Sequence, residues 1–331
     1  MDKKAQNILK YSFWIALAAV LVYFCLRAID WKEFGAALQQ CRWIYVVLAM
    51  LVGAAAQWFK GARWQLLLEP LDASASRITC FNAYNICMAS NLVLPRAGEL
   101  IRLGYAVKHS ALDAQGKRVL GFDKVLGTAV VERSWDALVC LSMLAALLVI
   151  MWDSMSAFLQ ERLGGVNAMA LAWTLAGLAI LGLAFLLLSW LLRDKGLGKI
   201  WGFVRGIGAG LSSFAHMRGW WLFLLYTLLI WGCHWLTSAA IVWALQDIPA
   251  FSSLTLTDAF LLMVLGSSSA IIPVPGGFGA YHGLVAGALM SFWNIPLGTA
   301  MIYATLNHES QVVMQALCGV ASYIHESFLR Q

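Results

Sequence analysis

The chain contains long apolar runs of the length that a lipid bilayer requires. An α-helix needs about 20 mostly apolar residues to cross the hydrocarbon core. The composition agrees, because 61% of the 331 residues are hydrophobic and only 12% are charged, about half the charge of a soluble domain. We therefore expect an all-α, polytopic membrane protein in which residues 1–331 form a single integral membrane domain. The predicted spans are residues 11–29, 43–59, 124–152, 167–192, 219–245 and 296–324.

Two further apolar stretches are interrupted by proline and glycine. Residues 79–107 contain Pro95 and Gly98, and residues 256–293 contain the sequence PVPGGFG. Proline and glycine break the hydrogen-bond ladder of a helix, so neither stretch reads as one straight helix. We expect each stretch to form a helical hairpin that enters the membrane and returns.

The basic residues give this layout an orientation. Cytoplasmic segments of membrane proteins carry an excess of Lys and Arg. With a cytoplasmic N-terminus and two re-entrant hairpins, most of the 23 basic residues fall on the cytoplasmic side. The pattern predicts a multi-pass protein of the cell (inner) membrane with both termini cytoplasmic. The first apolar run, residues 11–26, is expected to be a retained membrane helix rather than a cleaved signal.

The same order of elements occurs twice along the chain. Half one, about 11–152, reads span, span, hairpin, span, and half two, about 167–325, repeats this order from the opposite side of the membrane. The sequence LGTA opens the helix after each hairpin, at 126–129 and 297–300. We therefore expect six full spans plus two re-entrant hairpins in two inverted-topology halves. Transporters built in this way bind their substrate where broken helices meet near the bilayer midplane.

Placing an ionisable side chain inside an apolar membrane segment costs free energy, so such residues mark candidate functional positions. Glu132, Arg133 and Asp136 lie together in one predicted span. They fit either a structural ion network between helices or a role linked to the substrate. His308 and Glu309 lie in the last span, where they fit either a proton relay or a satisfied polar pair. We take these five residues as an intramembrane charge network.

The two interrupted stretches supply the candidate substrate-binding residues. Arginine in a water-accessible break binds phosphate in a bidentate way, and free N–H groups at helix ends suit an anion. These residues also have plain alternatives: a tight helix–helix turn for the glycines, exposure in a solvated loop for the arginines, a Glu–Arg pair that neutralises itself, and a backbone carbonyl as partner for His282. The candidate set is Arg96, Gly98, Glu99, Arg102, Pro275, Gly276, Gly277, Gly279 and His282.

Motifs of enzymes and of cofactor sites do not occur in the sequence. It contains no HExxH, no CxxC pair, no GxxxxGK loop and no GxSxG elbow; these patterns would indicate metal, phosphate or nucleophile chemistry. No basic stripe interleaved with aromatic residues indicates nucleic acid. We expect no catalytic residues, no metal, no cofactor and no nucleic-acid partner. The seven cysteines are expected to pack as small apolar side chains.

Three segments together resemble a known family. The sequences NLVLPRAGELIRLGYAV, VVERSWDAL and PVPGGFGAYHGLV, followed by a polar last helix, are similar to the lysylphosphatidylglycerol synthase transmembrane region, also called the flippase-like domain family, over residues 10–325. Many members continue the second break with Arg-Glu where this chain has Tyr281-His282, which leaves the preferred head group open. The matched positions are Pro95, Gly98, Glu99 and Arg102 in the first motif, Glu132, Arg133 and Asp136 in the charged helix, and Gly276, Gly277 and Gly279 in the second break.

The resemblance implies movement of a lipid rather than its chemical modification. In the bifunctional synthases of this group, the membrane region moves the modified lipid between leaflets and a separate soluble domain performs the aminoacyl transfer. We expect that soluble domain to be absent here. We expect a lipid translocase without an ATP site of its own, not an enzyme, that engages an anionic or zwitterionic head group through Arg96 and Arg102. The alternatives are a lipid-binding accessory subunit for a partner membrane enzyme, and a membrane-embedded transferase or hydrolase with Glu132 or Glu309 as base.

Overall fold

The protein is described here by a computed structural model. The residues that it describes are 31–93, 97–150, 214–271 and 274–328, together with Arg27 and Ser212. The elements formed by these residues are all helices, which confirms the predicted all-α class. The predicted span 11–29 apart from Arg27, the predicted span 167–192, the boundary between the two proposed halves, and the residues Pro95 and Arg96 lie outside the described residues.

The chain divides into two compact units. One unit comprises residues 1–120 and 217–331, and the other comprises residues 121–216. The α-helices of the first unit before its gap are α2 (Trp31–Gln40), α3 (Trp43–Leu68), α4 (Arg77–Val93) and α5 (Ala97–Lys108). After the gap they are α10 (Trp220–Ala244), α11 (Leu256–Ser268), α12 (Ala280–Trp293) and α13 (Leu297–Phe328). Short 3-10 turns connect the later helices: η1 (Pro249–Phe251), η2 (Ser269–Ile271) and η3 (Pro275–Gly277).

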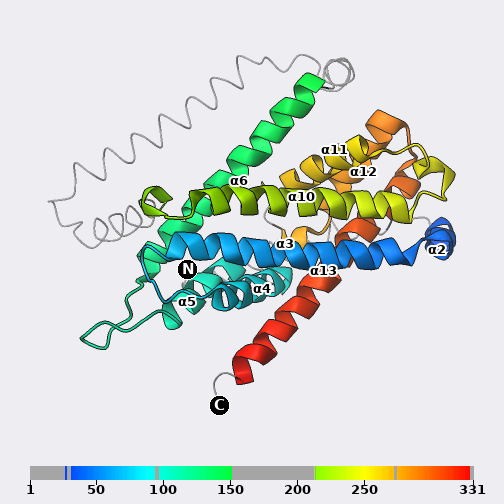
Figure 1. Ribbon diagram of the computed structural model, residues 1–331. Coiled ribbons are helices and arrows are strands. Elements are labelled where there is room, and N and C mark those ends of the chain that lie inside the picture. Colours follow the sequence, from blue (N-terminus) through cyan, green and yellow to red (C-terminus); the bar gives the residue numbers. More distant parts are fainter. Residues whose placement is uncertain are drawn as a thin grey trace, which may run out of the picture. The chain divides into compact units, whose positions relative to one another are not determined.

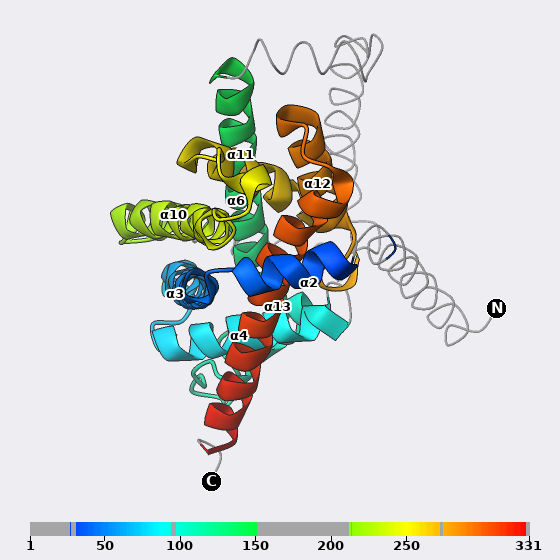
Figure 2. The ribbon, with the colours of Figure 1, turned by 90° about the vertical axis from the view of Figure 1, so that its right-hand side faces the viewer.

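Helices α3 and α10 pack side by side in opposite directions (Figures 1 and 2). The start of α3 meets the end of α10, where the backbone N–H of Arg42 donates to the carbonyl of Ala244 at 2.9 Å. Towards the other end, the rings of Phe59 and Tyr226 stack with centroids 6.1 Å apart. Within the described part of the chain, α3 and α10 are the two helices long and apolar enough to cross a membrane.

Helix α3 is longer than the predicted span and continues past residue 59 to Leu68. Lys60 and Arg63 therefore lie within a helix rather than beyond the end of the span predicted at 43–59. The Arg63 side chain is fully buried, and its Nη1 donates to Thr227 Oγ1 on α10 at 3.2 Å. A buried guanidinium requires such partners, and the neighbouring helix supplies one.

Helix α13 occupies the middle of the first unit, where it packs against α2, α3, α4, α10 and α12. Many of its buried contacts are made by small residues. Ala300 and Ala304 on α13 face a core that includes Ala239 and Ala240 of α10, all at most 1% exposed. In lipid, small residues favour helix association because they let backbones approach closely. Tyr303 adds a polar tie, since its hydroxyl lies 2.6 Å from Ser238 Oγ.

Both interrupted stretches form pairs of helices. Helix α4 packs against α5, and α11 packs against α12, so each break separates two helices that contact one another. The predicted spans 124–152 and 296–324 also form helices, α6 (Phe122–Ile150) and α13. Membrane re-entry of the pairs, and the total of six spans, stay predictions.

The second unit contains α6. The ring of Trp135 on this helix lies 5.8 Å from that of Phe214, centroid to centroid. Val131, Ser134 and Leu138 line a shallow hollow together with these two aromatic side chains.

Candidate functional site at the second helix break

Three glycines of the second break have φ angles in the left-handed region of the Ramachandran plot. The φ angles of Gly276, Gly277 and Gly279 are 58°, 77° and 81°. Residues with a Cβ atom rarely adopt such angles, so glycine is needed for the chain to pass from η3 into α12. Pro275 begins η3. The predicted interruption of the helix is therefore present in the structure.

The second break packs against the helix that leads into the first break. Helix α4 ends at Val93, immediately before residues 94–96, and it contacts η3. A Cβ atom built on Gly276 would lie 3.6 Å from Leu92 Cδ2. The end of α4 and the second break, far apart in the sequence, are thus neighbours.

His308 of α13 is hydrogen bonded to the second break. Its Nε2 lies 2.9 Å from the carbonyl oxygen of Gly276, and its Nδ1 lies 3.0 Å from Glu309 Oε1. A carbonyl oxygen can only accept, so Nε2 carries the proton of this bond. The ring of Phe278 packs edge-on at 5.2 Å from the ring of His308. His308 thus contacts both Glu309 and the break, and the choice between a proton relay and a satisfied polar pair stays a prediction.

His282 completes a cluster with these two residues. Its Nε2 lies 3.5 Å from Glu309 Oε1, and its ring centroid lies 5.0 Å from that of His308. The side chains of His282, His308 and Glu309 are 6%, 11% and 37% exposed. Among the described residues, His282 Nδ1 has no hydrogen-bond partner. We call His282, His308 and Glu309 the histidine cluster.

A hydrogen bond between Tyr281 and Asn307 also joins α12 to α13. Asn307 Nδ2 donates to the Tyr281 hydroxyl at 2.7 Å, and the Tyr281 ring lies 5.1 Å from that of His308. Each of these residues directly precedes a histidine of the cluster. The sequence singled out Tyr281 only as a departure from the family that the chain resembles, and the partner of Tyr281 on α13 was not predictable from local spacing.

At the first break, Glu99 and Arg102 form an ion pair. Arg102 Nη2 lies 3.0 Å from Glu99 Oε2, and the Arg102 side chain is fully buried. Its guanidinium carbon lies 4.5 Å from the ring centroid of Trp64 and 4.8 Å from that of Tyr84. Cation–π contacts of this kind stabilise a desolvated guanidinium. The pairing of Glu99 with Arg102 is present, and their contact with a head group stays a prediction.

Gly98 is a point of close approach between α4 and α5. A Cβ atom built on it would lie 2.0 Å from the carbonyl oxygen of Cys87. Its backbone N–H donates to Asn91 Oδ1 at 2.9 Å. The space at Gly98 is therefore filled by α4, and a contact with substrate at this position stays a prediction.

The predicted charged helix lies in the second unit. Glu132 is fully buried, Asp136 is half-buried and Arg133 is exposed on α6. This is the pattern expected when positions four apart share one helical face. Whether these side chains act on a substrate or hold helices together stays a prediction.

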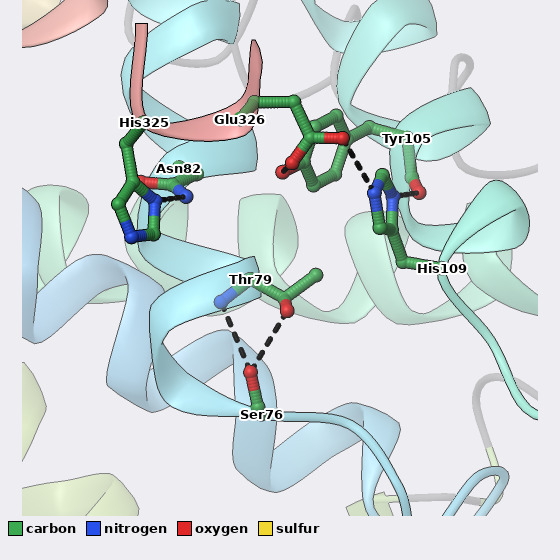
Figure 3. Close-up of polar contacts among 7 residues, drawn as sticks. All are labelled: Ser76, Thr79, Asn82, Tyr105, His109, His325 and Glu326. Atoms are coloured by element: carbon green, nitrogen blue, oxygen red, sulfur yellow. Dashed lines mark hydrogen bonds and ion pairs between the residues drawn. The ribbon is translucent and has the colours of Figure 1, made fainter. Parts of the chain in front are cut away.

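A polar group at the end of α13 was missed from the sequence. Glu326 accepts hydrogen bonds from the Tyr105 hydroxyl at 2.5 Å and from His109 Nε2 at 2.8 Å (Figure 3). Next to it, Asn82 Nδ2 lies 2.9 Å from His325 Nδ1. The last turn of α13 is thereby bound to α4 and α5. No motif signals this group, because its members come from three separate helices.

Comparison with known proteins identifies one family. The family model described as the lysylphosphatidylglycerol synthase TM region matches residues 12–319. This span includes both breaks and the histidine cluster. No curated protein and no solved structure matches the chain.

Proposed function

Because the chain belongs to the family of the lysylphosphatidylglycerol synthase transmembrane region, we propose that this membrane protein moves a phospholipid or a lipid-linked head group between leaflets. The proposal covers transport alone: the chain supplies a path for the head group and no catalytic residue. Without an ATP site, transport runs down a concentration gradient or is coupled to an ion gradient. A partner membrane enzyme would supply or consume the lipid.

The contact between α4 and η3 carries this proposal. A helix that stops within the membrane leaves backbone N–H and C=O groups that lipid cannot satisfy, so broken backbone must be buried in protein or line a polar cavity. Here the end of one interrupted helix lies against the interruption of another. Transporters hold their substrates where such broken helices meet.

The antiparallel packing of α3 and α10 supports the two inverted halves. Each helix is followed by a helical pair and then by another long helix: α3 by α4, α5 and α6, and α10 by α11, α12 and α13. Corresponding spans of an inverted repeat run in opposite directions across the membrane. We propose six full spans, two re-entrant pairs and two cytoplasmic termini in the cell membrane.

In this proposal the first break provides the positive charge for the head group. Arg96 lies in the break, and Arg102 follows one and a half turns into α5, held in place by Glu99, Trp64 and Tyr84. Guanidinium groups bind phosphate oxygens in a bidentate way. The head group is therefore anionic or zwitterionic.

Reconstitution into lipid vesicles tests the proposal. Fluorescent lipids with anionic and zwitterionic head groups are placed in both leaflets, and an impermeant reductant then quenches the outer leaflet. We expect quenching beyond the outer-leaflet fraction in protein-containing vesicles, and slower exchange in Arg102→Ala. Lys117→Ala, in an exposed loop, is the matched control. Exchange no faster than in empty vesicles, for every head group, overturns the proposal; lipid retained by that inactive protein would favour an accessory subunit.

A further inference from the structure

Three potential ligand atoms converge in the histidine cluster. A ring nitrogen of His282, a ring nitrogen of His308 and a carboxylate oxygen of Glu309 all lie within 4.8 Å of one another. His282 comes from α12, whereas His308 and Glu309 come from α13. The polar atoms meet in a setting that also includes the aromatic rings of Phe278 and Tyr281.

The hydrogen bonding of His308 leaves a lone pair pointing at a carboxylate. Its Nε2 donates to the carbonyl of Gly276 at 2.9 Å. In the neutral ring, Nδ1 is then an acceptor, and it faces Glu309 Oε1, which is also an acceptor, at 3.0 Å. Two acceptors at this distance repel one another unless a cation lies between them.

His282 turns this pair into a three-ligand arrangement. Its Nε2 lies 3.5 Å from the same carboxylate oxygen, longer than the usual range for an N–H···O hydrogen bond. Ligands about 2.0–2.1 Å from a tetrahedral zinc ion lie about 3.3 Å from each other. The two separations to Glu309 Oε1, 3.0 and 3.5 Å, bracket that value.

The other end of α13 offers an internal comparison. His109 also faces a carbonyl with one ring nitrogen, that of Tyr105 at 2.8 Å, and a carboxylate with the other, that of Glu326 at 2.8 Å. There, however, the third group is the Tyr105 hydroxyl, which brings its own proton to Glu326. In the histidine cluster the third group is instead an imidazole whose Nε2 lies 3.5 Å from the carboxylate and whose Nδ1 has no hydrogen-bond partner among the described residues.

We propose that His282, His308 and Glu309 bind a divalent transition-metal ion, with zinc the best fit. Two imidazoles and one carboxylate are a ligand set that zinc favours, with the fourth position left for water. The bond from His308 Nε2 to Gly276 is the outer-shell carbonyl contact that orients a metal-binding histidine. The ion would fasten the second break to α13. We expected no metal because no single segment has the spacing of a metal-binding motif. Such motifs do not reveal a site whose ligands come from two separate helices.

Metal content of the purified full chain tests this site without reference to transport. The chain is purified in detergent through an affinity tag that contains no histidine, stripped with a chelator, loaded with zinc and desalted. We expect one zinc ion per chain by elemental analysis, and a tetrahedral visible spectrum when cobalt replaces zinc. Since loss of an outer-shell partner costs about 10–100-fold in affinity, loss of a ligand should cost at least about 100-fold.

The variants separate metal binding from folding. His308→Ala and Glu309→Gln should lose the ion, whereas Glu309→His, which keeps a ligand, should retain it. His216→Ala and Glu69→Gln, at exposed positions, are the matched controls and should bind as the parent does. Gel filtration and thermal unfolding of the stripped variants check that each remains folded. Equal zinc content in the parent and in the double variant His282→Ala/His308→Ala would overturn the proposal and leave a proton as the cation of the cluster.

Discussion

His109, which directly follows α5, and Glu326 in the last turn of α13 are hydrogen bonded at 2.8 Å (Figure 3). The Glu326 side chain is only 5% exposed, and Tyr105 donates to its other oxygen. The bond joins the last helix to the first helical pair across most of the length of the chain.

Truncation of this carboxylate should loosen the end of α13. Glu326→Ala removes the acceptor of the half-buried Tyr105 hydroxyl and His109, and a donor left unsatisfied costs up to about 1–3 kcal/mol when fully buried. We expect a lower Tm in detergent and faster proteolysis near the C-terminus. Tyr323→Ala removes a side chain that is 70% exposed on the same helix and serves as the control; an equal loss in both variants would contradict the role assigned to Glu326.

Addition of a single methyl group should separate the first helical pair. In Gly98→Ala, the new Cβ would lie 2.0 Å from the Cys87 carbonyl, a backbone atom that cannot move aside by itself. Overpacking of this kind costs about 1–3 kcal/mol. Gly104→Ala on the same helix meets nothing within 4 Å and should be neutral or stabilising by up to about 1 kcal/mol. Thermal unfolding of the two variants side by side checks the contrast.

The Asp72 carboxyl, in the loop after α3, should make the stability of the fold depend on pH in the acidic range. Burial raises the pKa of the Asp72 carboxyl, but hydrogen bonds from the Ser74 hydroxyl, the Ser74 N–H and the Ala111 N–H outweigh it, so the pKa lies below its usual value. A carboxyl with a lowered pKa stabilises the fold above its unfolded-state pKa of about 3.9 and loses this effect as pH falls through the folded-state value.

Asp72→Asn should therefore be less stable at neutral pH by about 1–3 kcal/mol. It should also lose less stability than the parent when the pH falls below about 4, because the titrating group is gone. Tm measured across this acidic range compares the two proteins. The exposed Glu69→Gln is the control, and a parent-like acid response in Asp72→Asn would rule out this role for the carboxylate.

The inverted topology predicts the side of the membrane on which each end of α3 lies. Arg42 and Asp247 form an ion pair at 2.5 Å, so the start of α3 and the end of α10 share one face. In a background without the seven native cysteines, Arg42→Cys and Asp247→Cys should react with an impermeant maleimide on intact cells. Glu69→Cys, just past the other end of α3, should react only after permeabilisation. Labelling of all three from one side would contradict the proposed layout.

Hydropathy and helix-breaking residues were sufficient to predict much of the fold. The predicted spans 219–245, 124–152 and 296–324 became the helices α10, α6 and α13, and both interruptions fall where proline and glycine break the helical hydrogen bonds. Helix α3 was predicted too short because Lys60 and Arg63 read as loop residues. The Arg63 guanidinium is accommodated by a tertiary partner, Thr227, and no local pattern reveals a partner on another helix.

The candidate site, like the fold, could be predicted only in part from the sequence. Gly276, His308 and Glu309 could be singled out because glycine-containing breaks and charged residues within apolar segments can be recognised from the sequence alone. The approach of His282 to Glu309 depends on the packing of α12 against α13. The group around Glu326 depends on three helices and carries no motif, so spacing alone could not predict it.

Helix α13 contacts the second break through His308 and the first helical pair through Glu326. These two residues lie about 27 Å apart along the helix axis at 1.5 Å per residue. A continuous helix of this length acts as a stiff rod. We therefore expect a displacement of the second break to be passed along α13 to the far end of the first helical pair, unless the bonds at one of these two contacts first break. The second break and the first helical pair are thus attached to the same helix.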